Sequence, residues 1–204
     1  TSIEDALKNT KVAYTKSDNI GRAVAKELAR GNVVAWYQGR MEAGPRALGQ
    51  RSILANPTQE KYRDIVNGIV KFREDWRPFC PSVLEEEADR YFEQYTDAPY
   101  MILAFPVNDK MVKEAPAVVH SDGTARVQFV KREHSPIYHD MILSFAKLTG
   151  VPVVLNTSFN IRGEPVVCSI YDALRTFWGS GIDVLAAGDF LVKKSGGKSD
   201  VTRL

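Results

Sequence analysis

The sequence predicts an α/β (α+β) protein built on a twisted mixed β-sheet flanked by helices. Short runs rich in β-branched residues alternate with segments of helical periodicity along almost the whole chain, which is typical of that class. A length of 204 residues and a hydrophobic content of 44% suffice for one substantial core. Because no internal repeat or low-complexity linker interrupts the chain, we expect one main domain.

The first half of the chain predicts helices and strands in alternation. Ser17 can cap the start of a helix over residues 18–30, and Gly31 can close it. The apolar run 32–37 predicts a buried strand. Three glycines and one proline within residues 39–49 fit no regular element and predict a loop. Further along we predict a helix (59–70), a short strand (81–84) and a charged helix (85–95).

The second half continues the alternation and ends in a polar segment. Ser121-Asp122-Gly123 is a tight-turn sequence between two expected strands, and a break is expected near Gly188. Residues 1–16 are expected to be an N-terminal extension or interdomain linker, and residues 195–204 a flexible tail. The predicted strands are 101–107, 117–120, 124–130, 151–155 and 183–192, and the predicted helices are 139–148 and 170–178.

Composition and charge argue against several classes of function. A formal charge of +2 is too balanced to indicate a nucleic-acid-binding protein by bulk electrostatics. No apolar run reaches the length of a membrane span and no secretory signal is visible, so we expect no membrane association. Cys80 and Cys168 form no CxxC pair, which favours reduced thiols and a cytoplasmic location. Since the chain begins at Thr1 without an initiator methionine, we expect a piece of a longer protein.

Two segments carry cations suited to an anionic ligand. The arginine loop, residues 44–52, holds Arg46 between two glycines and Arg51 shortly after them, and such glycines let the backbone approach a ligand. The cationic loop, residues 71–79, places three cations among aromatic residues, which weaken screening by water. Each segment has a simpler explanation: a structural turn with paired arginines for the first, and a solvated loop neutralised by its own acids for the second.

Two further segments carry polar side chains on or after strands. Alternation along 124–130 puts Arg126 and Gln128 on one face, although for this segment alone a sheet face in water is the better explanation. The polar loop, residues 156–165, follows the predicted buried strand 151–155. Such loops are a preferred place for ligands in α/β folds, and the density of short polar side chains favours binding over a simple turn.

Taken together, these segments resemble the C-terminal domain of the nodulation-type and antibiotic O-carbamoyltransferase family. The matching strings are GRMEAGPRALGQRSILANP, WRPFCPSV, HSDGTARVQ and LNTSFNIRGEPVV, in that order. The similarity covers about residues 17–194, and Ala43 stands where the family carries a bulkier residue. The resemblance implies a YrdC-like fold that turns carbamoyl phosphate and ATP into carbamoyl adenylate, on behalf of an enzyme that modifies a hydroxyl acceptor.

The resemblance also implies roles for individual residues. Arg46, Arg77 and Asn156 are expected to hold carbamoyl phosphate, and Lys71, Arg126 and Ser158 to contact ATP, with Arg46, Lys71 and Arg77 as the catalytic set. We expect Mg²⁺ to accompany ATP, bound by the phosphates and not by a protein metal site. Additional candidates are Gly44, Arg51, His120, Asn160 and Arg162.

The same resemblance implies partners that this sequence does not contain. These are an N-terminal domain of actin-like ATPase fold with a histidine-bound iron, and a homodimer of the full-length protein. Two other hypotheses stay open. One is a YrdC-like nucleotide- or RNA-binding module without independent catalysis, against which the near-neutral charge counts. The other is a nucleotide-binding module that is catalytically incomplete without its partner domain.

Overall fold

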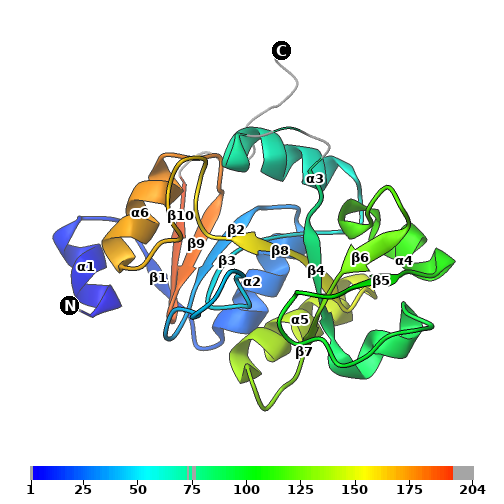
Figure 1. Cartoon of the computed structure of the whole chain (residues 1–204). Coiled ribbons are helices and arrows are strands. Elements are labelled where there is room, and N and C mark those ends of the chain that lie inside the picture. Colours follow the sequence, from blue (N-terminus) through cyan, green and yellow to red (C-terminus); the bar gives the residue numbers. More distant parts are fainter. Residues whose placement is uncertain (1, 73, 75–76, 195–204) are drawn as a thin grey trace.

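A mixed eight-stranded β-sheet forms the centre of the molecule (Figure 1). The computed structural model describes residues 2–72, 74 and 77–194. Within these residues the strand order is β1-β10-β9-β2-β3-β8-β4-β7, and β5 pairs with β6 in a separate ribbon. The strands are β1 (Thr15–Lys16), β2 (Val34–Tyr37), β3 (Arg51–Ala55), β4 (Cys80–Leu84), β5 (Ala104–Pro106), β6 (Thr124–Arg126), β7 (Gln128–Val130), β8 (Val153–Ser158), β9 (Val184–Ala187) and β10 (Phe190–Lys193).

The sheet mixes parallel and antiparallel neighbours, as predicted. β2 runs parallel to β9 and β4 parallel to β7, whereas β3 is antiparallel to β2 and β8 is antiparallel to both β3 and β4. β8 therefore lies in the interior of the sheet, and its carboxyl end lies beside the start of β3 and the start of β4. That edge carries the polar residues of the candidate site.

Helices cover both faces of the sheet, which explains the continuous apolar runs of its central strands. On β2, Val34 and Trp36 belong to a core shared with α2 and α5, whereas Ala35 and Tyr37 face the other core, which α1 and α6 help to close. α2 and α5 lie side by side (Figure 1). The α-helices are α1 (Ile3–Asn9), α2 (Ile20–Ala29), α3 (Lys61–Ile65), α4 (Asp109–Glu114), α5 (Pro136–Thr149) and α6 (Ile170–Trp178).

Several predicted elements change type or length. The segment 85–95 is not an α-helix: residues Glu85–Arg90 form a 3₁₀-helix, which crowds side chains three residues apart. The predicted strand 117–120 is also wrong, because Pro116–Val118 forms a second 3₁₀-helix. The helix that begins at Lys61 continues from Val66 to Lys71 as a π-helix. β8 reaches Ser158, beyond the predicted end at residue 155, because its polar residues still pair with β3.

The cap of α2 and the N-terminal segment also differ from the prediction. α2 is capped by the side chain of Asn19, not by Ser17 as predicted. Residues 3–16, which we expected to precede the domain, add α1 to the core through the fully buried Ala6 and Leu7. The predicted break at Gly188 falls between β9 and β10. The expected tail 195–204 lies outside the described residues. Among the residues that the structure describes, no helix is long and apolar enough to cross a bilayer.

Candidate functional site

The arginine loop is held in place by Glu42. One carboxylate oxygen, Oε1, accepts hydrogen bonds from the backbone N–H groups of Leu48 at 2.7 Å, Gln50 at 2.8 Å and Arg51 at 3.4 Å. A carboxylate that accepts several backbone N–H groups makes strong, charge-assisted bonds. Glu42 therefore gives a segment without regular structure a defined shape.

Arg51 stabilises the backbone around this loop through hydrogen bonds. Its side chain is buried, and its Nη atoms donate to the carbonyl oxygens of Gln38 at 2.7 Å, Gln50 at 3.0 Å and Gly39 at 3.2 Å. The guanidinium also stacks 3.7 Å from the ring centroid of Tyr37. Since its Nη groups bind these carbonyl oxygens, Arg51 holds the backbone, and it lines neither of the cavities described next.

Two adjoining cavities bring most of the predicted residues together. The first, the arginine cavity, has a volume of about 140 Å³ and is lined by Arg46, Arg126, Asn156 and Ser158 with their neighbours. The second, the lysine cavity, has a volume of about 280 Å³ and is lined by Ser158 with Lys71, Glu74, Arg77, Asn160, Ile161, Arg162 and Gly163.

Ser158 lines both cavities, so the two hollows meet at the end of β8. Among the described lining residues, five side chains are cationic and one is a carboxylate, that of Glu74. Such an excess of positive charge favours anionic ligands, because fixed cations attract phosphate oxygens strongly where water is partly excluded. The five cations are Arg46, Lys71, Arg77, Arg126 and Arg162.

Lys71 connects the π-helix to the polar loop. The side chain is buried, and Nζ donates to the backbone oxygens of Ser158 at 2.6 Å and Asn160 at 2.9 Å. It also reaches the side-chain oxygens of the same two residues, at 3.3 and 2.9 Å. The π-helix ends directly after Lys71, at Phe72, whose φ of 49° is left-handed. A π-helix and a strained residue side by side are features that often accompany functional sites.

Arg77 and Arg162 lie at the mouth of the lysine cavity. Arg77 is half-exposed, and its Nε lies 3.7 Å from a carboxylate oxygen of Glu74. Arg162 is exposed, with Nη1 3.5 Å from the carbonyl oxygen of Phe72. Because neither contact is short, both guanidinium groups can turn toward a ligand at low cost.

Arg46 and Arg126 both line the arginine cavity. The guanidinium of Arg126 contacts the thiol of Cys80, with Nη2 and Nε at 3.1 and 3.3 Å from Sγ. Arg46 Nε is buried and has no hydrogen-bond partner among the described residues. Buried donors normally have partners, so a ligand with acceptor oxygens would satisfy this atom.

Asn156 is the centre of a buried polar network. Its Nδ2 donates toward the carbonyl oxygen of Ala47 at 3.1 Å, Ser82 Oγ at 3.0 Å and Gln128 Oε1 at 3.3 Å. Gln128 Nε2 in turn donates to the carbonyl oxygen of Leu48 at 2.9 Å. The network therefore ties three strands to the arginine loop. Asn156 Oδ1 is buried and has no partner in the described part of the chain.

Gly44 and His120 line neither cavity. Gly44 lies in the arginine loop with a φ of 144°, and a Cβ there would meet open space. His120 lines a separate hollow of about 840 Å³, together with residues of α3 and of the turn 119–122. Burial lowers the pKa of His120, and Asp122 partly offsets that shift. Pro78 borders both this hollow and the arginine cavity.

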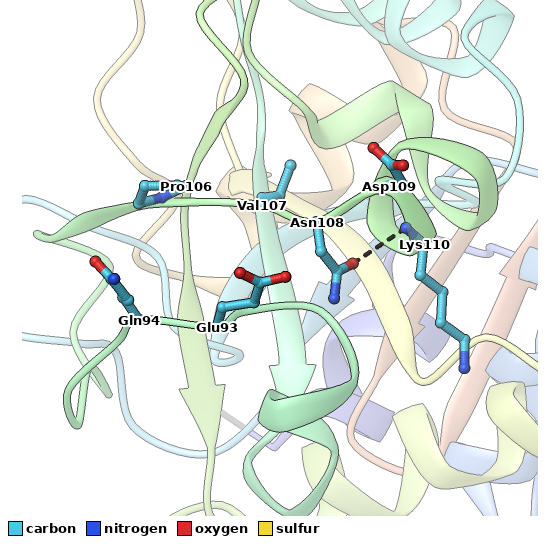
Figure 2. Close-up of a pocket in the computed structure, with 7 residues that line it drawn as sticks. All are labelled: Glu93, Gln94, Pro106, Val107, Asn108, Asp109 and Lys110. Atoms are coloured by element: carbon cyan, nitrogen blue, oxygen red, sulfur yellow. Dashed lines mark hydrogen bonds between the residues drawn. The ribbon is translucent and has the colours of Figure 1, made fainter.

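Another hollow, of about 700 Å³, lies beside α4 and contains none of the predicted residues (Figure 2). Its lining mixes acids, amides and one lysine: Glu93, Gln94, Pro106, Val107, Asn108, Asp109 and Lys110. The side chain of Asn108 is occupied as the N-cap of α4, where it accepts from Lys110 N and Met111 N. This hollow lacks the convergent cations of the other two.

The described residues contain no group of three or more His, Cys, Asp or Glu side chains that could hold a metal ion. Three residues that organise the arginine cavity were not singled out from the sequence: Glu42, Cys80 and Ser82. The contacts of Cys80 and Ser82 join segments far apart in the chain, so no local spacing marks them. Glu42 binds backbone N–H groups of its own loop, but no regular element there predicts the direction of its side chain. The period-two pattern that pairs Gln128 with Arg126 was a usable signal, but it did not indicate which partner Gln128 binds.

The relatives of this chain are longer than the chain itself. Nodulation protein NolO of Bradyrhizobium diazoefficiens is 46% identical over 182 residues, which cover 88% of this chain and 33% of that protein. The 3'-hydroxymethylcephem-O-carbamoyltransferase of Amycolatopsis lactamdurans is 39% identical over 170 residues, covering 83% of the chain and 32% of the enzyme. The chain thus spans about a third of the length of these curated relatives.

Solved structures with this fold confirm the YrdC-like architecture. Sua5 of P. abyssi, complexed with L-threonine, matches with a TM-score of 0.58 at 17% identity, over 83% of this chain and 46% of that one. Full-length HypF, in a phosphate- and nucleotide-bound form, matches with a TM-score of 0.56 at 16% identity, over 89% and 22%. The model of the family described as "Carbamoyltransferase C-terminus" matches residues 25–194, and this chain belongs to that family.

Proposed function

We propose that this chain binds carbamoyl phosphate and ATP in its two adjoining cavities and converts them into carbamoyl adenylate. The observation that supports the proposal most is the convergence of five cations on two hollows that share Ser158. Both substrates are polyanions, so their approach requires fixed positive charge to offset repulsion. Membership of the carbamoyltransferase C-terminal family supports the carbamoyl group as the part transferred.

The proposed division of residues follows the family resemblance. Arg46, Arg77 and Asn156 hold carbamoyl phosphate, and Lys71, Arg126 and Ser158 contact ATP. Since Arg46 and Arg126 line the same cavity, the two ligands would meet there with their phosphates between opposing guanidinium groups. Mg²⁺ would accompany ATP on the phosphates, because the described residues offer no protein cage for it.

A balanced reaction takes up one water. Water attacks the phosphorus of carbamoyl phosphate and breaks its P–O bond, which gives carbamate and inorganic phosphate. A carbamate oxygen then attacks the α-phosphorus of ATP, forming carbamoyl adenylate, and the bond to the β-phosphate breaks to release pyrophosphate. Both steps depend on alignment and charge stabilisation more than on a protein nucleophile, which suits a site of arginines, a lysine and amides.

In this proposal the chain serves an O-carbamoyltransferase that modifies a hydroxyl acceptor. The remaining length of the relatives leaves room for the domain that would use the adenylate. The expected actin-like domain with its iron, the homodimer and the cytoplasmic location belong to the same proposal.

The test is pyrophosphate release that depends on carbamoyl phosphate. We expect Arg46→Ala and Arg77→Ala to lower it about a hundredfold or more, the usual cost of removing a group that stabilises developing charge. Arg175→Ala is the control, because Arg175 is an exposed residue of α6 paired with Asp172. Full activity in both site variants would contradict the assignment.

Two other outcomes would favour the alternatives. ATP binding by the wild-type chain without any adenylate formation would indicate a binding module that needs its partner domain. Tight, steeply salt-dependent binding of tRNA, without use of carbamoyl phosphate, would indicate an RNA-binding module.

A further inference from the structure

We propose that Gln128 and Ser82 fix the orientation of the Asn156 side-chain amide, and that the arginine cavity therefore selects a ligand carrying an N–H donor. The inference rests on the proposed function and deepens it. It supplies a physical reason for the site to accept carbamoyl phosphate and to reject acetyl phosphate, which has a methyl group in place of the NH₂ group.

The first group that orients these amides is a backbone carbonyl of the arginine loop. Gln128 lies 2.9 Å from the carbonyl oxygen of Leu48. A carbonyl oxygen can only accept, so the NH₂ end of the Gln128 amide faces Leu48. Its Oε1 consequently faces Ser82, whose Oγ lies 2.8 Å away.

The hydroxyl of Ser82 in turn determines which end of the Asn156 amide faces it. A hydroxyl has one proton to donate, and Ser82 donates it to Gln128 Oε1. Toward Asn156, 3.0 Å away, Ser82 can therefore only accept. The other neighbours of Asn156 Nδ2, the carbonyl oxygen of Ala47 and Gln128 Oε1, are also acceptors. A flipped amide would place Oδ1 against these oxygens.

The fixed amide leaves one acceptor for the ligand. Asn156 lines the arginine cavity, and its Oδ1 has no partner among the described residues. Gln128, Ser82 and Asn156 form a relay of hydrogen bonds, and their side chains are almost fully buried, with exposed fractions of 5%, 0% and 1%. An unpaired acceptor at such depth is costly, so a ligand N–H gains from meeting it, whereas a methyl group leaves it unpaired and a carboxylate oxygen repels it.

The guanidinium groups cannot provide this selectivity. Arg46 and Arg126 recognise phosphate oxygens, which carbamoyl phosphate and acetyl phosphate share. Discrimination must come from the group that meets the other end of the ligand. A site built to bind an N–H rejects analogues that lack it far more strongly than an apolar pocket does.

Two stable analogues isolate this one difference. Phosphonoacetamide keeps the amide of carbamoyl phosphate and replaces its bridging oxygen with CH₂, and 2-oxopropylphosphonate differs from it by carrying a methyl group instead of NH₂. Isothermal titration of the full chain with each compound gives a ratio of dissociation constants. We expect the wild-type chain to prefer the amide by about tenfold to a hundredfold.

The variants Gln128→Met and Ser82→Ala interrupt the relay at two points. We expect the preference to fall about threefold or more in each, because one of the groups that hold Nδ2 is lost and the carbonyl oxygen of Ala47 then opposes a flipped amide with less support. Affinity for 2-oxopropylphosphonate should change less than about twofold. Gln38→Met is the matched control, since Gln38 is a buried amide that binds the carbonyl oxygen of Gly188, away from Asn156.

The results separate the two proposals. An unchanged preference in both variants, with circular dichroism confirming that they fold, would overturn the role of Gln128 and Ser82 and leave the proposed function standing. A wild-type chain that binds the two analogues equally would overturn the selectivity. A chain that binds neither analogue, and releases no pyrophosphate with carbamoyl phosphate, would overturn the proposed function and this inference with it.

Discussion

The guanidinium of Arg126 rests on the sulfur of Cys80, with Nη2 3.1 Å and Nε 3.3 Å from Sγ. Arg126 ends β6 and Cys80 begins β4, so the contact joins the small ribbon to the main sheet. Sulfur is a weak acceptor, and it holds the guanidinium without binding it as tightly as a carboxylate would. Arg126 therefore keeps its position and remains able to exchange this contact for a phosphate.

A larger residue at position 80 should disturb that position. Cys80→Leu adds bulk to a cavity of only about 140 Å³, and overpacking of this kind costs about 1–3 kcal/mol. We expect the affinity for ATP to fall about tenfold or more, as measured by isothermal titration. Cys168→Leu changes an exposed cysteine and should leave the affinity unchanged. Equal ATP binding by both variants would show that Cys80 does not position Arg126.

Removal of the Lys71 charge should weaken the fold as well as the site. Lys71→Met keeps the length of the side chain but loses the contacts to Ser158 and Asn160. Hydrogen bonds to a charged group contribute about 1.5–3 kcal/mol, so we expect the free energy of unfolding in urea to fall by about 2 kcal/mol or more. Lys110→Met, on α4, is the control. A loss of ATP binding with unchanged stability would contradict the structural half of this role.

Two glycines of the arginine loop should differ in their tolerance of alanine. At Gly49, with a φ of 104°, a Cβ would lie 2.5 Å from Cδ1 of Tyr138, whereas at Gly44 it would meet nothing within 4 Å. We expect Gly49→Ala to destabilise the chain by about 3 kcal/mol or more, and Gly44→Ala by about 1 kcal/mol. Thermal unfolding of the two variants checks the order, and equal melting temperatures would contradict it.

His120 should make stability depend on pH. Burial lowers its pKa in the folded chain, whereas the unfolded chain titrates near its ordinary value of about 6.5. The unfolded chain therefore binds more protons, and the contribution of His120 is present above about pH 6.5 and lost as the pH falls. We expect the free energy of unfolding to decline between about pH 7.5 and 5, and His120→Asn to flatten that decline. His134→Asn is the control, and identical slopes in both variants would contradict the prediction.

Local patterns were sufficient for most of the regular structure. The apolar run at residues 32–37 identified β2, because both of its faces are buried and a periodic polar face is absent. Helix α6 forms at the predicted residues 170–178, and the structure adds a capping box between Ser169 and Asp172 at its start. Where the prediction failed, as at residues 85–95, the composition suited a helix but did not distinguish an α-helix from a 3₁₀-helix.

The candidate site could be predicted only in part. Arginines between glycines are visible in the sequence, but their neighbours depend on strand order, which local spacing does not encode. Arg46 and Arg126 are eighty residues apart in the chain and share a cavity because β8 lies between β3 and β4. Conversely, Arg51 lies in the same loop as Arg46, yet its contacts are with backbone carbonyls. Arg46 lies between two glycines and Arg51 follows them, but this difference does not indicate which arginine faces a cavity.

Asn156 and Ser158 alternate along β8, so both side chains leave the same face of the strand. The pleat sets their separation at about 7 Å, twice the rise per residue. A strand paired on both sides cannot stretch, and the two hollows therefore keep a constant spacing. β8 thus fixes the distance between the two hollows. Insertion of a single residue between positions 156 and 158 would turn one side chain to the opposite core, and Ser158 and Asn156 would no longer line the same side of the strand.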